Sequence, residues 1–115
     1  MKKDYRIRKN EEFSRIIAEK NSTAGKEFII YASLRREDNC RIGISVSKKL
    51  GKAVIRNKIK RQLRMMLLNV IDFDNEKYDY IVIVRPDYLN HSFDENKKGL
   101  ENTIKKVKIK RNVKR

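Results

Sequence analysis

The chain has 115 residues, the length of one ordinary domain, and it carries 30 lysines and arginines against 15 aspartates and glutamates, a formal net charge of +15 at pH 7. No stretch approaches the roughly 20 apolar residues of a membrane-spanning helix, no apolar signal-peptide core follows the basic start, and the single cysteine, Cys40, excludes an internal disulfide. Such an excess of cations favours a polyanionic partner, nucleic acid or an anionic membrane surface, and we expect a cytoplasmic protein.

Nothing in the sequence marks a domain boundary. It contains no internal repeat, no low-complexity linker and only one proline. We therefore predict a single domain over residues 1–115, with flexible basic ends at about residues 1–8 and 108–115.

The first predicted element is a short helix, about Asn10 to Lys20. Asn10 has the side chain of an N-cap, and Glu11 and Glu12 would lie in the first turn, where the helix dipole favours acids. The apolar residues recur at helical spacing, so one face of this helix would carry Phe13, Ile16 and Ile17.

Two strands are predicted next, because residues 27–34 and 40–47 are rich in β-branched and aromatic side chains. The polar segment 35–39 between them predicts an antiparallel pair. On the second strand, Arg41, Gly43, Ser45 and Ser47 alternate with apolar residues. One face of the first strand carries Ile29, Tyr31 and Ser33. Pairing this face with the polar face of the second strand would make a shallow floor with Tyr31 on it, which is either a solvated sheet face or a ligand-binding floor.

Three further elements complete the predicted order α-β-β-α-β-α. A helix is expected at about Lys52 to Ile71, and the almost continuously apolar residues 78–85 predict a strand covered on both faces and central in the sheet. Ser92 and Glu95 have the spacing of a capping box. The helix that follows them carries Leu100, Ile104 and Val107 at helical spacing.

The helix at residues 52–71 has a cationic stripe. At 100° per residue, its basic side chains fall on one side and its aliphatic side chains on another. A solvated charged face normally mixes signs and gains from i,i+4 pairs, but residues 39–71 contain no acid. Phosphates of a ligand would compensate these charges. A membrane surface is disfavoured because the stripe lacks Trp and Phe anchors, and no helix-turn-helix or zinc pattern indicates duplex DNA.

At this point the sequence resembles a known family, the bacterial ribonuclease P protein subunit. A strand ending in Ser-Val-Ser-Lys-Lys leads to an Arg-Asn-x-x-Lys-Arg-x-x-Arg helix, complete here at Arg56, Asn57, Lys60, Arg61 and Arg64. The segments RIRKNEEF, EFIIYA and YDYIVIVRP also match the family's pattern in order. The resemblance implies an α/β (α+β) two-layer sandwich similar to domain 2 of ribosomal protein S5. Its mostly antiparallel sheet would contain a left-handed βαβ crossover, against the usual hand.

The resemblance also implies a function. The chain would be the non-catalytic protein subunit of an endoribonuclease, a single RNA-binding domain that helps an RNA subunit remove the 5′ leader of precursor tRNA. Its partners would be the RNA subunit, bound 1:1 by a monomeric protein, and precursor tRNA, without a membrane. Mg2+ would be bound chiefly by the RNA. The implied contacts to the RNA subunit are Lys52, Arg56, Asn57, Lys60, Arg61 and Arg64.

A cleft for the single-stranded leader is implied between the sheet and the first helix. By match of position its residues would be Phe13, Ile17, Tyr31, Ser45, Lys48 and Lys49. Family members often carry an aromatic residue where this chain has Ile17, so stacking at that turn would be replaced by apolar contact. Without the resemblance, Phe13 reads as an ordinary core residue.

The side chains offer no protein catalyst of their own. His91 is the only histidine, and Asp72 and Asp74 share a loop without a third candidate ligand, so we expect neither catalytic nor metal-ligating residues. Cys40 lies in an apolar alternating run and is expected to be a small buried thiol. The alternative reading is a ribosomal or general RNA-binding protein without an associated reaction.

Overall fold

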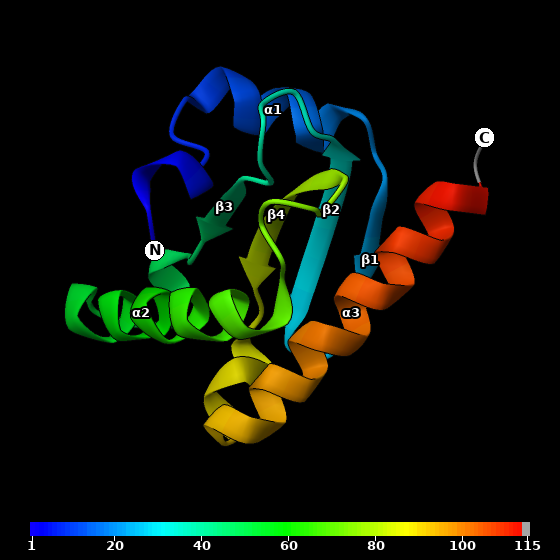
Figure 1. Ribbon diagram of the computed structural model, residues 1–115. Helices are drawn as coiled ribbons and strands as arrows, with labels where there is room; N and C mark the ends of the chain where they lie inside the picture. The colour runs from blue at the N-terminus through cyan, green and yellow to red at the C-terminus, as the bar shows by residue number, and fades with distance from the viewer. Residues whose placement is uncertain (114–115) are drawn as a thin grey trace.

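A four-stranded sheet in the order β1-β2-β4-β3 forms the centre of the molecule. The computed structural model describes the backbone of residues 1–113 and the side chains of residues 1–108. The strands are Ser22–Ala24 (β1), Phe28–Leu34 (β2), Ile42–Ser45 (β3) and Tyr78–Val84 (β4). Helices α2 (Ala53–Val70) and α3 (Phe93–Val113) cover one face, and α1 (Asn10–Ala18) packs on the other (Figure 1). The predicted order αββαβα is confirmed, with β1 as an additional short strand that the residues Ser-Thr-Ala did not indicate.

The predicted antiparallel pairing of the strands on either side of residues 35–39 is wrong. Strand β4 lies between them, antiparallel to β2 and parallel to β3, so that Val82 pairs with both Ile30 and Ile44. The physical reason is the composition of β4: it is apolar along nearly its whole length and buried on both faces, so the central position shields it best. Its prediction as a central strand covered on both faces is confirmed.

Helix α2 connects the parallel strands β3 and β4. In Figure 1, α2 lies in front of the sheet, both strands point downward, and β4 lies to the right of β3. This is the left-handed sense of a βαβ unit, which is rare because the usual strand twist favours the right-handed crossover.

Two apolar cores flank the sheet. The larger one joins the sheet to α2 and α3, and it includes Phe28, Ile42, Tyr80, Leu63 and the predicted α3 residues Leu100, Ile104 and Val107. The smaller core joins the sheet to α1 through Ile7, Ile16 and Ile81, with Phe13, Tyr31 and Ile83 packed against them. Since only Ile16 of α1 is fully buried, α1 is held by much less apolar contact than the other two helices.

Helix α3 begins with a side-chain cap, whereas α1 and α2 each begin after a lysine that provides none. Helix α2 begins after Lys52 and ends before Ile71, as predicted to within one residue. The capping box is confirmed: the Ser92 backbone N–H donates to Glu95 Oε1 at 2.9 Å, and the Glu95 N–H donates to Ser92 Oγ at 3.2 Å. These bonds hold the pKa of Glu95 below its ordinary value. The assignment of Asn10 as an N-cap is wrong, because Lys9 takes that position without a side-chain cap and Asn10 is already helical.

The basic segment at the start of the chain lies along the edge of β3. Residues Lys3–Tyr5 form a 3-10 helix, and Arg6 makes a parallel bridge to Ile42. The Ile7 N–H donates to the Ile42 carbonyl at 2.9 Å, and the Tyr5 ring stacks on Phe73 at 4.2 Å between centroids. At the other end, the predicted flexible tail falls partly outside the described residues, which include no side chains beyond 108 and no backbone beyond 113.

Cys40 is buried in the larger core, as predicted. Burial, reinforced by the charge of Asp79, raises the pKa of its thiol well above the usual value. We expect a disulfide reagent to label Cys40 at neutral pH only as fast as the protein unfolds, because the thiolate is the reactive form. Labelling measured with and without denaturant checks this, and rapid reaction in native buffer would contradict it.

Candidate nucleic-acid interface

The cationic stripe of α2 faces away from the core. Ile59, Leu63, Met66 and Leu67 turn the opposite side of this helix into the larger core, where each is at most 2% exposed. Of the predicted RNA-contacting residues, Lys52, Asn57 and Arg61 are therefore exposed, and Arg56, Lys60 and Arg64 are half-buried. The structure brings all six together on α2 and its N-cap.

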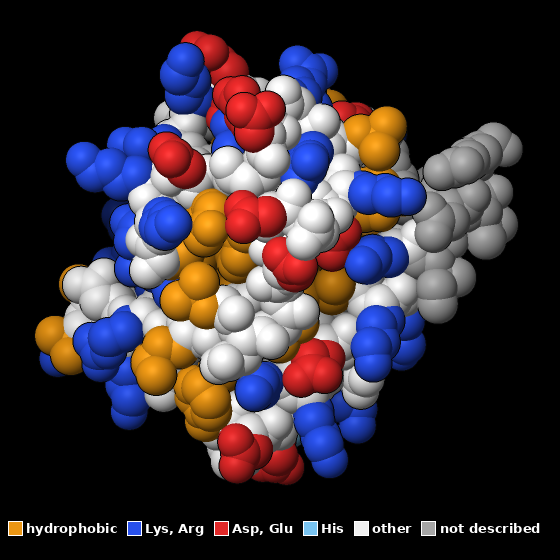
Figure 2. Space-filling model, viewed as in Figure 1, with side chains coloured by type: hydrophobic (Ala, Val, Ile, Leu, Met, Phe, Trp, Pro, Cys, Tyr) orange, Lys and Arg blue, Asp and Glu red, His pale blue; other side chains and the backbone are white. Residues whose placement is uncertain are grey.

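No carboxylate neutralises this stripe within the described part of the chain. The ion pairs there involve Arg15, Arg41, His91 and Lys108, none of which belongs to α2. In the view of Figure 2, lysines and arginines cover the left side, over the first turns of α2 and the N-terminal segment, and others lie on the right along α3, while the acids lie mostly over the top and centre with some at the bottom. Unpaired like charges on one helix repel one another, so this surface is suited to a polyanion.

Arg56 is fixed in place by the loop that precedes the helix. Its Nε donates to the Gly51 carbonyl at 3.2 Å, and Gly51 has φ +144°, a backbone conformation that L side chains rarely adopt. A Cβ at Gly51 would also come within 2.9 Å of the Ile55 side chain. This loop therefore presets one guanidinium of the stripe.

A basic hollow of about 230 Å³ connects α2 to α1. Its walls carry four cations and no acid: Arg6 and Arg8 from the N-terminal segment, and Lys60 and Arg64 from α2. Phe13, Ile42 and Ile44 add apolar lining. The Nε atoms of Arg6 and Arg64 are buried without a hydrogen-bond partner. Burial lowers the pKa of Arg64, and the charge of Arg6 lowers it further. An anion placed in the hollow would relieve both the repulsion and the unmet hydrogen bonding.

The sheet face under α1 is organised in three rows of directly paired residues. One row contains Ser33 and Asp79; the next contains Tyr31, Ile81 and Gly43; the third contains Ile29, Ile83 and Ser45. Helix α1 covers the first row with polar contacts and the second with Phe13 and Ile16. In the third row Ile29 and Ile83 are half-buried and Ser45 is exposed, so a partly exposed apolar strip lies beside α1.

The predicted leader-binding residues border this strip. Phe13 and Tyr31 pack into the smaller core beside it, and Ile17 is 37% exposed on the next turn of α1. Ser45 ends β3, and the exposed Lys48 and Lys49 follow in the 3-10 helix Lys48–Leu50. These residues come from α1, β2, β3 and the 3-10 helix that directly follows β3. The predicted polar floor is corrected in one respect: because β4 is central, apolar residues occupy its middle.

Three residues of this surface were not predicted from the sequence. Strand alternation places Ile29 on the same face as Tyr31, but Ile83 joins this floor only through the pairing of β2 with β4, a register that alternation alone does not give. Arg6 and Arg8 were noted only as part of a basic end. The bridge between Arg6 and Ile42 places them beside α2, and no local signal predicts that bridge.

The Phe13 ring rests on Gly43. A Cβ at Gly43 would lie 2.5 Å from Phe13 Cζ, a contact that real structures do not tolerate. We expect Gly43→Ala to displace the ring and to lower the free energy of unfolding by about 1 to 2 kcal/mol, as overpacking does. Urea denaturation measures this loss, with Gly99→Ala as the control, since the atoms met there belong to the end of the Glu27 side chain. An unchanged stability would mean that α1 is free to shift.

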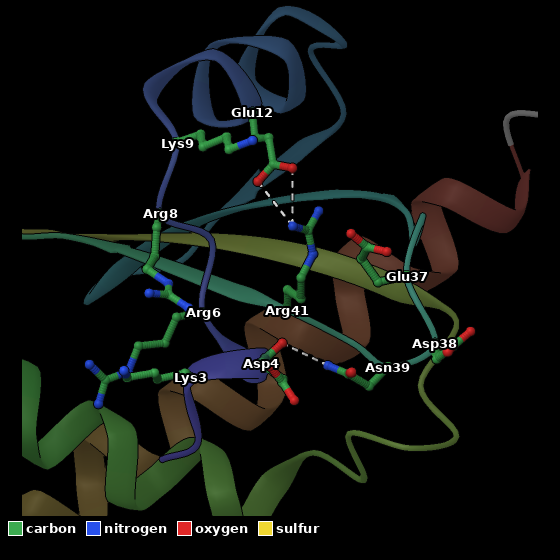
Figure 3. Close-up of a pocket in the computed structure, with 10 residues that line it drawn as sticks. All are labelled: Lys3, Asp4, Arg6, Arg8, Lys9, Glu12, Glu37, Asp38, Asn39 and Arg41. Atoms are coloured by element: carbon green, nitrogen blue, oxygen red, sulfur yellow. Dashed lines mark hydrogen bonds and ion pairs between the residues drawn. The ribbon is translucent and has the colours of Figure 1, made fainter.

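A second hollow, of about 560 Å³, lies beside the first and has mixed charge (Figure 3). Acids and bases both line it, among them Asp4, Glu12, Lys9 and Arg41. Arg41 Nη1 donates to both carboxylate oxygens of Glu12, at 3.0 and 3.1 Å. Because its charges neutralise one another, this hollow is less suited to phosphate than the basic one.

The described residues include no group of three histidine, cysteine or acidic side chains placed to hold a metal ion. His91 Nδ1 lies 3.0 Å from Glu27 Oε2, and Asp72 accepts a hydrogen bond from Asn75 within a turn. The unneutralised cations of the stripe and of the basic hollow suit this surface to phosphate groups. Within the described part of the chain, no helix combines the length and hydropathy needed to span a bilayer.

Comparisons with known proteins identify a family model and relatives that match nearly the whole chain. The family model described as Ribonuclease P matches residues 1–108. The chain is 43% identical to the ribonuclease P protein component of a Geobacillus species, over 99% of this chain and 100% of that protein. It is 46% identical to the corresponding protein of Geobacillus kaustophilus, over 92% and 88%.

Solved structures share the fold. An RNase P protein mutant from Staphylococcus aureus with defective mRNA degradation activity superposes with a TM-score of 0.83 at 39% identity, covering 92% of this chain and 90% of that one. The RNase P protein from Thermotoga maritima gives a TM-score of 0.71 at 30% identity, covering 84% and 92%. The similarity thus extends over nearly the whole described chain, including α2 and the sheet face.

Proposed function

This chain belongs to the bacterial ribonuclease P protein family, and from that premise we propose which of its surfaces bind each RNA partner of the enzyme. The chain is the protein subunit of ribonuclease P, an endoribonuclease of tRNA processing whose partners are an RNA subunit and a tRNA substrate. In our proposal, the stripe on α2 binds the RNA subunit, and the apolar strip beside α1 binds the single-stranded 5′ leader of precursor tRNA.

The observation that carries the proposal is the unneutralised stripe on α2, which continues through the basic hollow to the strip beside α1. Lys60 and Arg64 belong to both the stripe and the hollow, and Phe13 lines the hollow from α1. A polyanion bound along α2 could therefore contact cations continuously from the stripe to the edge of the cleft. The leader phosphates can follow the rim while bases contact Phe13, Tyr31 and the isoleucine floor.

The physical mechanism has two parts. Docking of the cations against folded RNA releases condensed counterions and lowers local repulsion, so the holoenzyme works at a lower Mg2+ concentration. The leader contacts favour precursor over mature tRNA, which lacks a leader and can leave. We assign Mg2+ chiefly to the RNA subunit, because the described side chains offer no donor set for it. The protein acts in the cytoplasm, off the membrane, as a monomer bound 1:1 to the RNA.

Reconstitution with the cognate RNA subunit tests this function. Cleavage of precursor tRNA is measured over a Mg2+ series with RNA alone, protein alone and both together. We expect the protein to shift half-maximal cleavage to lower Mg2+ concentrations. We also expect it to lower the KM for precursor tRNA without raising the affinity for mature tRNA. A general RNA-binding protein would instead bind both tRNAs equally, and that result would overturn the leader-binding role.

A further inference from the structure

Polar contacts attach α1 to the sheet at both ends. Near its start, Glu12 accepts the two hydrogen bonds from Arg41 described above, and Figure 3 shows the two side chains pointing toward each other across the hollow. Near its end, the Ser33 hydroxyl donates to Glu19 Oε2 at 2.8 Å, and Arg15 Nη1 donates to Ser33 Oγ at 3.3 Å. We call these contacts the α1 clamp.

The sheet end of the clamp is rigid. Arg41 also bonds the fully buried Asp79: its backbone N–H donates to Asp79 Oδ1 at 2.8 Å, and Nη2 lies 3.4 Å from Oδ2. Arg41 itself is only 8% exposed. Burial acts to lower the pKa of Arg41, but the hydrogen bonds and charges of Glu12 and Asp79 raise it, so the guanidinium stays charged. Ser33 pairs directly with Asp79, so both ends of α1 are attached to the same row of the sheet.

The clamp matters because α1 has few other means of staying in place. A helix of nine residues is marginal on its own, and Ile16 is the only fully buried residue it contributes. Phe13 and Ile17 lie between the two attachments, on the side of α1 that borders the third row. A shift of α1 by a fraction of its diameter would narrow or open the strip at Ile29 and Ile83.

We propose that Glu12, with Glu19 at the opposite end, is a positioning residue for the leader. The α1 clamp holds Phe13 and Ile17 at a fixed height over the floor, so that a base can enter between helix and sheet without first reorganising the protein. The inference rests on the proposed leader cleft and adds to it an acidic residue whose task is to keep α1 in the binding-competent position.

Glu12→Ala compared with Glu11→Ala tests the proposal. Both substitutions remove one carboxylate from the first turn of the same helix, but Glu11 is exposed and forms no ion pair among the described residues. Simple electrostatics predicts that either change strengthens binding of an anionic leader. The positioning role predicts instead that Glu12→Ala weakens leader binding, because a smaller fraction of the molecules would hold α1 in the binding-competent position.

The measurement is the ratio of precursor to mature tRNA affinity in the reconstituted holoenzyme. We expect Glu12→Ala to lower this ratio about fivefold, a change within the range of a typical net hydrogen bond, and Glu11→Ala to leave it unchanged or raise it. Glu12→Gln keeps one accepting oxygen, so its ratio of precursor to mature tRNA affinity should lie between those of wild type and Glu12→Ala. Amide exchange of the free protein should accelerate in α1 but not in α2, which separates loss of position from global unfolding.

The possible results distinguish failure of the leader cleft from failure of the positioning role. If wild-type holoenzyme does not prefer precursor, the leader cleft is wrong and the inference falls with it. If wild type prefers precursor but the two alanine variants behave alike, only the positioning role is overturned. Should Glu12→Ala unfold, Ser33→Ala loosens the other end of α1 and should lower the same ratio. An unchanged ratio in Ser33→Ala with faster α1 exchange would also overturn the inference.

Discussion

Arg64→Met should stabilise the free protein and, at the same time, weaken its binding to the RNA subunit. Arg64 lies one helical turn from Lys60 and close enough to Arg6 for the two charges to repel, and its Nε is buried without a partner. Removing the charge while keeping the apolar stem relieves this repulsion. We expect a gain of about 0.5 kcal/mol in the free energy of unfolding at low salt, typical of like-charge neighbours on a helix.

The same substitution removes one phosphate contact. We expect the affinity for the RNA subunit to fall about tenfold at low salt and the slope of log affinity against log salt to decrease by about one. Urea denaturation and a binding titration over a salt series measure the two effects. Lys98→Met on α3 is the control, an exposed lysine outside the basic hollow. A variant that is destabilised yet binds RNA normally would show that Arg64 serves the fold and not the interface.

Tyr31→Leu should weaken binding of precursor tRNA and leave mature tRNA unaffected. Leucine keeps apolar bulk in the smaller core but removes the ring on which a base can stack. The expected loss is about 1 to 3 kcal/mol, roughly 5- to 150-fold in affinity. Because Phe13 also covers Gly43, Tyr31 is the cleaner of the two aromatic residues to test.

Ile17→Phe is expected to increase precursor binding, which complements the loss expected for Tyr31→Leu. Ile17 is already 37% exposed on α1, so a larger ring there can reach solvent without entering the core. We expect it to strengthen precursor binding selectively, by stacking that isoleucine cannot offer. Both variants are compared in reconstituted holoenzyme with precursors of increasing leader length. Equal effects on precursor and mature tRNA would assign these positions to folding.

The sequence predicted those parts of the fold that depend on near neighbours. The bounds of α2, the capping box at Ser92 and the buried side of α3 all follow from spacing within one element. Strand pairing does not, because it depends on which strand is best shielded at the centre of the sheet. The polar turn at residues 35–39 indicated a hairpin, but the two-sided burial of β4 outweighs that local signal.

The candidate site divides in the same way. The stripe on α2 could be read from residue spacing and the lack of acids, because a helix fixes the relative directions of its own side chains. The strip beside α1 could not, since its floor exists only once β2, β3 and β4 are paired. Strand alternation alone placed Tyr31 on a possible binding floor, Phe13 was assigned to it only through the family resemblance, and Ile83 joins it by the register in the structure.

The central position of β4 has a consequence for the order of events during synthesis. Strands β2 and β3 both leave the ribosome before β4, yet they do not pair with each other: β3 has β4 as its strand partner, and β2 lies between β4 and the short β1. The nascent chain therefore exposes the cations of α2 near ribosomal RNA before the β2-β4-β3 part of the sheet exists to orient them. The floor beside α1 can form only after translation through Val84, and the core that seats α2 is complete only when α3 has followed.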